Sequence, residues 1–303
     1  MIAGSPRSGT TIVQEVFETL PGYKSINEPL LHREIRAAHG FATRSYIPEW
    51  GEAPRQHRYL EAVLQGRPGR TVRWSSRSES RWDQIVDHAR TRRLMVKFCR
   101  INRMLPWFCR NFETRGVVFV VRHPCSVVSS MLKFGQWDRV FPDRLNDPDS
   151  PLALEGLPAG TRDVFAPIVS SIATKEEALA AIWALDHYIP LFEASQHPWI
   201  LLSYERLLAD SRRELDRINS GLGLRTSEAM LDRLARPSSS AIQPQLSGRG
   251  EQLAKWRRDL SRDQIDRILG VVERAQLGHL YSEAAEPDYA ALNRFQDPAV
   301  RWA

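Results

Sequence analysis

The stretch MIAGSPRSGTTIVQEVF, residues 1–17, decides the fold. Its first four residues form a short, mostly apolar run, which predicts a buried strand. The residues after Gly9 have the pattern of a helix. A strand joined to a helix by small residues lets the backbone approach an anion closely, and the helix N-terminus adds free N–H groups. Residues 4–11 therefore predict an anion-binding loop between the first strand and the first helix.

Strand and helix patterns continue to alternate along the chain, which is typical of a parallel α/β sheet. The run GVVFVV at residues 116–121 is apolar at successive positions, as expected for a strand covered on both faces. We predict a P-loop-like parallel β-sheet flanked by helices, in a single domain over residues 1–303. The predicted strands are Met1–Gly4, Arg93–Lys97, Gly116–Val121, Trp199–Ser203 and a weaker one near Thr71–Trp74; the predicted helices are Gly9–Leu20, Pro124–Lys133, Lys175–Ala194, Arg212–Leu222 and Arg262–Ala275.

Two stretches, Phe41–Pro54 and Gly135–Pro167, lack clean periodicity and are rich in Pro, Asp and Gly. The second is longer than a normal connection, and long loops in compact domains often cover a site. We expect residues 135–170 to form a lid or a substrate loop, with a disordered surface insertion as the alternative. In the helix predicted at Lys175–Ala194, Trp183 lies on the apolar stripe and is expected in the core.

The composition is that of an ordinary globular protein, with 42% hydrophobic and 26% charged residues. The net charge is +6, and only five of the 42 basic residues are lysines. Arginine suits phosphate and sulfate ligands, but a GC-rich genome explains the bias equally well. The basic residues do not form a block with interleaved aromatics, so a nucleic-acid partner is not expected.

The three cysteines, Cys99, Cys109 and Cys125, have neither disulfide-scaffold nor zinc-ligand spacing. The sequence has no apolar run of about 18 residues, which argues against a membrane-spanning helix. The chain starts without a basic leader followed by an apolar stretch, so we expect a cytoplasmic protein. Nothing in the sequence indicates the oligomeric state.

The loop at residues 4–11 nearly matches the Walker A pattern GxxxxGK[ST], but Thr10 stands where the pattern has lysine. That lysine normally reaches the β- and γ-phosphates of a nucleoside triphosphate. Its absence disfavours a P-loop kinase or NTPase, which is the alternative enzyme class. Arg7 is the cation that the loop offers to a ligand.

The segment SPRSGTT resembles the 5'-phosphosulfate loop of sulfotransferases that use 3'-phosphoadenosine-5'-phosphosulfate (PAPS). In that family a Lys or Arg precedes the Ser-Gly-Thr of the loop. The resemblance implies that Arg7, Ser8, Gly9, Thr10 and Thr11 bind the donor nucleotide.

A second motif, VVRHPCSVVSSML, follows the apolar run at residues 116–121 and continues into a predicted helix that starts at Pro124. Arg122 at the strand end and Ser130, two turns into the helix, can converge on one anion. The motif is similar to the family's 3'-phosphate motif, which has an Arg and a Ser at this spacing. That phosphate distinguishes PAPS from ATP.

Three later segments extend the resemblance. SYERLLAD places Tyr204 where the family has a tyrosine against the adenine, and RPSSSA resembles its serine-rich adenine loop, indicating Ser238 or Ser239. GRGEQLAKWRRDLS resembles the final cofactor loop. Arg249 precedes Trp256 by seven residues, as in the RKG triplet of the cytosolic enzymes, but Gly250 and Glu251 replace the Lys and Gly.

Sulfuryl transfer needs in-line geometry, stabilised charge on the oxygens and a base for the acceptor hydroxyl. Arg7 and the loop amides suit that charge, and Lys97 matches the lysine of the cytosolic family's KxH motif. Cys99 replaces the catalytic histidine of that motif, and a thiol is a poor base for this reaction. Glu28, in SINEPLLH, is the predicted base, because bacterial and carbohydrate sulfotransferases place a carboxylate here; His32 and His123 are lesser candidates, and His123 is expected to be structural.

The resemblance thus implies a PAPS-dependent sulfotransferase of the bacterial or carbohydrate type. Its product would be 3'-phosphoadenosine-5'-phosphate (PAP), no metal is expected, and the acceptor would be a hydroxyl-bearing glycan, glycolipid or small-molecule alcohol. A non-catalytic PAPS- or PAP-binding protein remains the alternative outside the enzymes. Such a protein would have no need of a base at Glu28.

Overall fold

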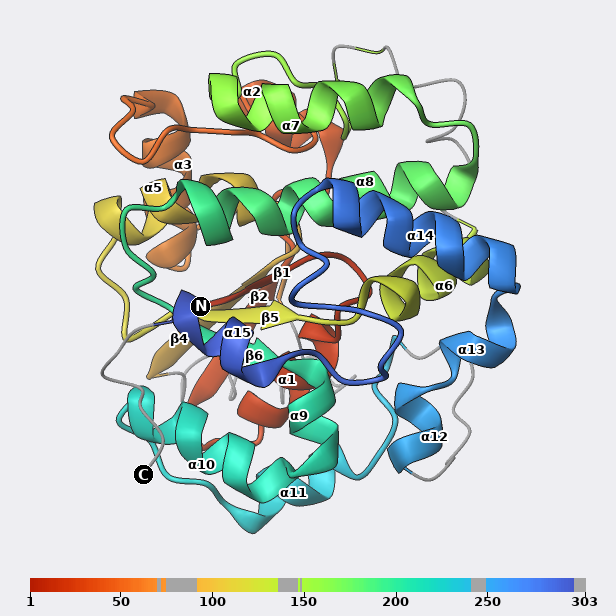
Figure 1. Cartoon of the computed structure of the whole chain (residues 1–303). Coiled ribbons are helices and arrows are strands. Elements are labelled where there is room, and N and C mark those ends of the chain that lie inside the picture. Colours follow the sequence, from red (N-terminus) through yellow and green to blue (C-terminus); the bar gives the residue numbers. More distant parts are fainter. Residues whose placement is uncertain (70–71, 75–91, 136–146, 148, 241–248, 297–303) are drawn as a thin grey trace.

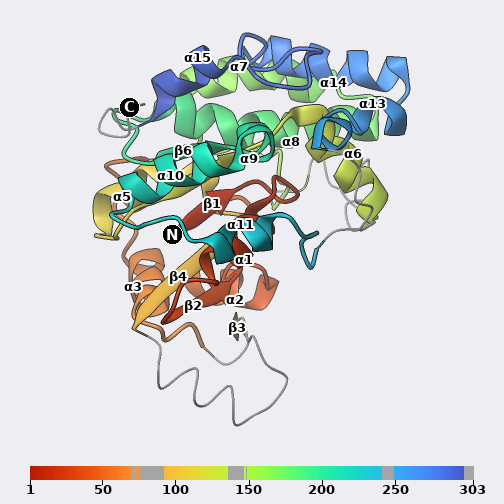
Figure 2. The same cartoon turned by 90° about the horizontal axis from the view of Figure 1, so that it is seen from below.

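A six-stranded sheet forms the centre of the computed structural model, which describes residues 1–69, 72–74, 92–135, 147, 149–240 and 249–296. The strands are β1 (Ile2–Gly4), β2 (Tyr23–Asn27), β3 (Arg73–Trp74), β4 (Arg93–Phe98), β5 (Val118–Val121) and β6 (Ile200–Ser203), in the spatial order β3-β2-β4-β1-β5-β6. Figure 2 shows this order from β6 down to β3. The pairs β2–β4, β4–β1, β1–β5 and β5–β6 are parallel, whereas β3 is antiparallel to β2. The prediction of a parallel α/β sheet is confirmed.

The sheet is covered on both faces by helices. Figure 1 shows α6 (Pro124–Phe134), α8 (Lys175–Tyr188) and α14 (Arg262–Arg274) on one side, and α1 (Thr10–Phe17), α9 (Tyr204–Ala209), α10 (Ser211–Gly221) and α11 (Glu228–Leu234) on the other. In β5, Phe119 and Val121 pack into one apolar cluster and Val118 and Val120 into the other, which explains the continuous apolar run. The remaining elements are α2 (Arg33–His39), α3 (Pro54–Leu64), α5 (Leu105–Asn111), α7 (Ala159–Ser170), α12 (Arg249–Leu253), α13 (Trp256–Asp259), α15 (Tyr289–Leu292), the 3₁₀ helices η1 (Asn102–Met104) and η3 (Asn293–Phe295) and the π-helix η2 (Ile189–Glu193).

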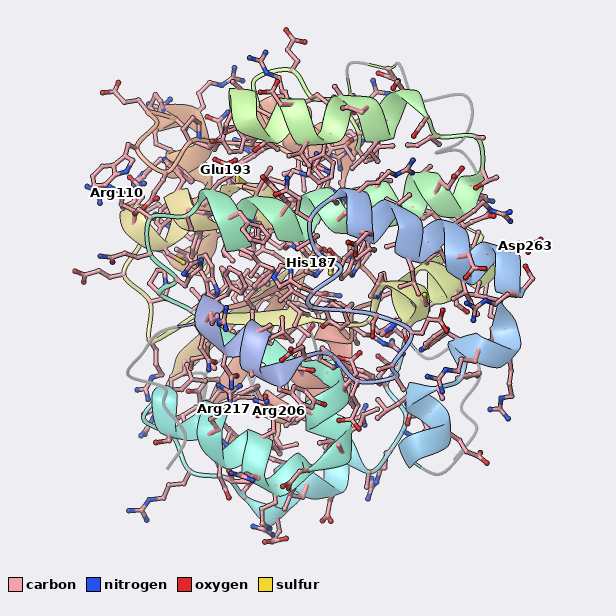
Figure 3. The ribbon with its side chains drawn as sticks, viewed as in Figure 1. Arg110, His187, Glu193, Arg206, Arg217 and Asp263 are labelled. Atoms are coloured by element: carbon pink, nitrogen blue, oxygen red, sulfur yellow. The ribbon has the colours of Figure 1, made fainter. Side chains whose placement is uncertain are left out.

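Helix α8 begins with a capping box in which Thr174 and Glu177 bond each other's backbone N–H groups. Trp183 on this helix is 1% exposed, which confirms its predicted core position. The π-helix η2 continues α8, so the predicted helix Lys175–Ala194 corresponds to both elements. In Figure 3, His187 of α8 lies in the interior, and Arg217 of α10 lies beneath the sheet, where its Nη2 donates to the carbonyl of Leu201 in β6 at 2.6 Å.

The other sequence predictions have mixed outcomes. The irregular stretch Phe41–Pro54 is confirmed up to the start of α3 at Pro54. The irregular stretch Gly135–Pro167 is wrong from residue 159 onward, because these residues belong to α7, which tolerates Pro167 inside it. Much of the proposed lid, residues 136–146 and 148, lies outside the described residues, as does Thr71 of the weak strand. The lid over 135–170 and the single domain over 1–303 remain predictions.

Strand β2 was not predicted. Its sequence, YKSIN, lacks the apolar run of β5, yet Ser25 and Ile26 are both fully buried. Ser25 is tolerated there because its hydroxyl accepts a hydrogen bond from Gln14 of α1 at 2.6 Å. This strand places the residue that follows it, Glu28, at the same sheet edge as the ends of β1, β4 and β5.

Candidate active site

A cavity of about 420 Å³ lies at the carboxyl ends of the parallel strands. Open parallel sheets bind ligands at this edge, where loops from neighbouring strands meet. Most of the predicted site residues line the cavity: Arg7, Gly9, Thr10, Thr11, Glu28, Lys97, Arg122, Ser130, Tyr204 and Ser238. Segments far apart in the sequence are thus brought together as predicted.

The loop after β1 has a backbone that few residues tolerate. Gly9, the N-cap of α1, has φ 97°, and a Cβ at this position would overlap the ring of Tyr204. Arg7 also has a positive φ, 68°. Ser8 is fully buried and does not line the cavity, since its hydroxyl donates to the Ser5 carbonyl at 2.6 Å. The Ser8 side chain thus bonds within the loop itself. Its contact with the donor remains a prediction.

The Arg7 side chain lies against residues that were predicted for the other end of the nucleotide. Its Nε donates to the Ser130 hydroxyl at 2.9 Å, and its Nη2 donates to the Ser240 carbonyl at 3.2 Å. The guanidinium also packs over the Phe134 ring, 4.6 Å from its centroid. Arg7 therefore links the loop after β1 to helix α6 and to the segment that contains Ser238.

Arg122, directly after β5, is held by two contacts. Its Nη1 donates to the Arg7 carbonyl at 3.1 Å, and its guanidinium lies over the Tyr204 ring, 4.3 Å from the centroid. Its Nε is buried and has no hydrogen-bond partner among the described residues. Arg122 is thus fixed in the cavity wall with a donor left for a ligand.

Glu28 and Lys97 form an ion pair at the other end of the cavity. Glu28 Oε1 lies 3.4 Å from Lys97 Nζ, and Glu28 Oε2 accepts a hydrogen bond from the Cys99 amide at 3.1 Å. The backbone of Glu28 has φ 52°, a left-handed conformation that is uncommon for a residue with a side chain. Strained backbone of this kind often accompanies function.

Lys97, near the end of β4, is 5% exposed and also donates to the Thr11 hydroxyl at 3.3 Å. Burial lowers the pKa of Lys97, but the charge of the Glu28 carboxylate and its bond to Lys97 oppose burial, and that pKa lies above its ordinary value. The side chain is therefore a cation at neutral pH. It connects the loop after β1 to Glu28.

Cys99, in the histidine position of the cytosolic motif, is buried beside Thr10, with Sγ 3.3 Å from the Thr10 hydroxyl. Burial, assisted by the charge of Glu28, raises the pKa of this thiol to about 12. A neutral thiol cannot take a proton from the acceptor. Cys99 therefore fills space in the cavity wall.

Replacing Cys99 by Ser should leave the reaction almost intact, because the serine hydroxyl can keep the contact with Thr10. We expect turnover to change by less than about tenfold, which corresponds to about 1.4 kcal/mol in the activation barrier. Steady-state assays of Cys99→Ser beside the wild type measure this directly. A loss of several hundredfold in a folded variant would assign a chemical role to the thiol.

The two histidines named as lesser bases lie in different surroundings. His123 is fully buried; its Nδ1 accepts from the Cys125 amide at 3.2 Å, and its Nε2 lies 2.9 Å from the Ser282 carbonyl. Burial lowers the pKa of His123 to about 4. It caps α6 and does not line the cavity. His32 is exposed at the start of α2 and does not line the cavity.

An ion pair between two helices holds the segment that contains Ser238 and Ser239. Arg233 of α11 pairs with Glu15 of α1, and Glu15 Oε1 accepts from the Ser239 amide at 3.0 Å. Ser238 lines the cavity and lies 3.1 Å, Oγ to Oγ, from Ser240. Arg249 is the first residue of α12, and its side chain lies outside the described part of the chain, so its phosphate contact remains a prediction.

Several cavity residues are not among those that the sequence predicts. Ser126 lies four residues before Ser130 on α6, a spacing that puts both on one helix face and could have identified it. Lys133 Nζ pairs with Asp259 Oδ1 at 2.6 Å, which joins α6 to α13. Arg100 also lines the cavity. Lys133 and Arg100 contact residues that are far away in the sequence, and no motif indicates either position.

The sequence profile of the sulfotransferase family matches residues 1–154, just over half of the 303 residues. This chain belongs to the sulfotransferase family. The family consists of PAPS-dependent enzymes, which confirms the predicted enzyme class. The match contains the loop after β1, Glu28, Lys97 and the Arg122–Ser130 motif.

Two solved structures resemble this sulfotransferase. The sulfotransferase domain from the Synechococcus PCC 7002 olefin synthase is 19% identical, with 88% of this chain and 91% of that chain covered and a TM-score of 0.44. The mouse sulfotransferase SULT7A1 complexed with PAP is 13% identical, with 98% and 88% covered and a TM-score of 0.43. No curated protein matches the sequence.

Two further findings on this sulfotransferase concern membrane-spanning helices and metal sites. Within the described residues, none of the helices combines the length and the apolar character needed to cross a membrane. In the same part of the chain, no group of three His, Cys, Asp or Glu side chains is placed to hold a metal ion.

Proposed function

We propose that this sulfotransferase transfers the sulfuryl group of PAPS to an acceptor hydroxyl, with Glu28 as the general base. The observation that carries the proposal is the shared cavity, in which the loop after β1 lies between the Arg122–Ser130 region and the Glu28–Lys97 pair. A nucleotide with phosphates at both ends of its ribose needs anion sites on both sides of such a loop.

The donor would lie along the loop. The N–H groups at the start of α1 and the Thr10 and Thr11 hydroxyls would bind the 5'-phosphosulfate. Arg122 and Ser130 would bind the 3'-phosphate, with Tyr204 against the adenine, and Ser126 would extend this site on α6. Arg7 is a residue of this loop, and its Nε is bonded to the Ser130 hydroxyl. On donor binding, Arg7 would exchange that hydroxyl for an oxygen of the donor.

In the chemical step, the acceptor oxygen forms a bond to sulfur while the bond from sulfur to the bridging phosphate oxygen breaks. PAP leaves with that electron pair, and Glu28 takes the hydroxyl proton. The Lys97 ammonium, 3.4 Å from Glu28, would stabilise the charge that develops on the sulfuryl and bridging oxygens.

Binding of PAP should be much tighter than binding of AMP or ATP. AMP lacks the 3'-phosphate, and ATP meets a loop without the Walker lysine. A phosphate held by Arg122 and Ser130 should make the difference between PAP and AMP roughly 30-fold or more, or about 2 kcal/mol. Calorimetric titrations of the wild-type protein with the three nucleotides test this. Equal affinity for AMP and PAP would show that the 3'-phosphate site does not exist.

A further inference from the structure

The cavity end at Glu28 is bordered by arginines that the proposed donor site does not use. Arg100 lines the cavity, and its Nη1 lies 3.9 Å from Glu28 Oε2. The Arg44 side chain, 2% exposed, places Nη1 3.0 Å from Asp186 Oδ2 and 2.5 Å from the Cys99 carbonyl, to which it donates. Cys99 and Arg100 are adjacent in the chain, so both guanidinium groups belong to one region beside the proposed base.

Positive charge exceeds negative charge in this region. Burial lowers the pKa of Arg100, and the like charge of the neighbouring Arg44 guanidinium lowers it further. Arg36 is affected in the same way by burial and by Arg44, against the opposing attraction of Asp149. Among the described residues, the buried and half-buried charged groups gathered here are the cations Arg36, Lys97, Arg44, Arg100 and Arg103 and the carboxylates Glu28, Asp149 and Asp186.

Several N–H groups of these arginines also lack acceptors. The Nε of Arg100 and the Nε and Nη2 of Arg44 are buried and have no hydrogen-bond partner among the described residues. Leaving charged donors buried and unpaired is costly, and buried polar groups are nearly always bonded. The planar guanidinium fork matches carboxylate, sulfate and phosphate groups through two parallel hydrogen bonds.

We propose that the acceptor of this sulfotransferase is itself an anion, and that Arg100, backed by Arg44, binds a carboxylate or sulfate group next to the hydroxyl that reacts. This inference rests on the proposed function, because it takes Glu28 as the mark of the acceptor side. The negative group balances the excess of cations and gives an acceptor to the free N–H group of Arg100, which lines the cavity. A neutral alcohol leaves both uncompensated, and a site of this kind discriminates strongly against an analogue that lacks the bonded group.

The test uses the full-length protein saturated with PAP, so that the phosphate sites of the donor are filled. Glucuronate and inorganic sulfate are the anionic probes, and glucose is the neutral match for glucuronate. Calorimetry should show that both anions bind and that glucose binds at least about tenfold more weakly than glucuronate. Arg100→Gln should remove the preference for glucuronate, Arg100→Lys should keep part of it, and Arg274→Gln, an exposed arginine on α14, should match the wild type.

Three outcomes overturn the inference. The first is equal binding of glucuronate and glucose, and the second is an unchanged preference for glucuronate in Arg100→Gln. In the third, Arg100→Gln weakens binding of PAPS but not of PAP, which would assign the arginine to the sulfuryl group of the donor. Failure of the proposed function itself is recognised separately, because the wild-type protein would then not bind PAP. Thermal melts of each variant show that it is folded.

Discussion

Replacing Glu28 by Gln should lower turnover by roughly 10²–10⁴-fold, the range that a general base contributes. The amide keeps the shape of the carboxylate and can still accept the hydrogen bond from the Cys99 amide. It cannot accept the proton of the acceptor hydroxyl. Affinity for PAP should barely change, because the residues proposed to bind the phosphates lie on other segments. Steady-state kinetics with calorimetry on the same preparation separate these two quantities.

Glu28 also pairs with Lys97, so a loss of activity needs a control for structural damage. Affinity for PAP provides it: a correctly folded Glu28→Gln should keep the wild-type dissociation constant for PAP while its turnover falls. Glu34→Gln, an exposed carboxylate on α2, should behave as the wild type. Retained activity in Glu28→Gln together with a loss in Cys99→Ser would mean that the acceptor binds on the other side of the donor from the one proposed. His32 would then be the next candidate for the general base.

Replacing Arg122 by Ala should weaken PAP binding by about 2–4 kcal/mol, or roughly 30- to 800-fold. A charge-assisted contact is lost, and a phosphate is left without its partner. Part of the interaction is Coulombic, so the effect should shrink as salt is added. Calorimetry at two salt concentrations measures both effects.

Arg122 also supports its neighbours, because it packs on Tyr204 and donates to the Arg7 carbonyl. Comparison of PAP with AMP separates the two roles. If Arg122 binds the 3'-phosphate, Arg122→Ala should weaken PAP far more than AMP and remove most of the difference between them. An equal loss for both nucleotides would mean that Arg122 only holds the loop, and an unchanged dissociation constant would contradict its assignment.

Much of this site could be predicted because its residues follow buried parallel strands. The apolar runs ending near Gly4 and Val121 identify β1 and β5, and strands with both faces covered have few other interpretations. Parallel strands end at a common edge, so the loop after β1 and Arg122 had to meet. The resemblance to the family then indicates PAPS as the expected donor.

The rest depends on contacts that no local pattern encodes. Strand β2 can contain the buried Ser25 because Gln14 of helix α1 donates a hydrogen bond to its hydroxyl. Neither hydrophobicity nor periodicity therefore predicts this strand. Without β2, the pairing of Glu28 with Lys97 cannot be derived, although both residues were expected at the site. The hydrogen bond between Arg7 and Ser130 joins positions 123 apart in the sequence and was not foreseen. Burial of Arg44 against Asp186 has the same long-range origin.

The left-handed backbone at Glu28 sets folding against the proposed chemistry at a single position. Holding a side-chain-bearing residue in this conformation costs about 1–2 kcal/mol, which glycine would avoid entirely and asparagine in part. A procedure that ranked sequences by folding free energy alone would therefore discard the carboxylate at residue 28 early. Thermostable versions of this enzyme should be sought at positions away from the cavity, with residue 28 kept fixed throughout the design.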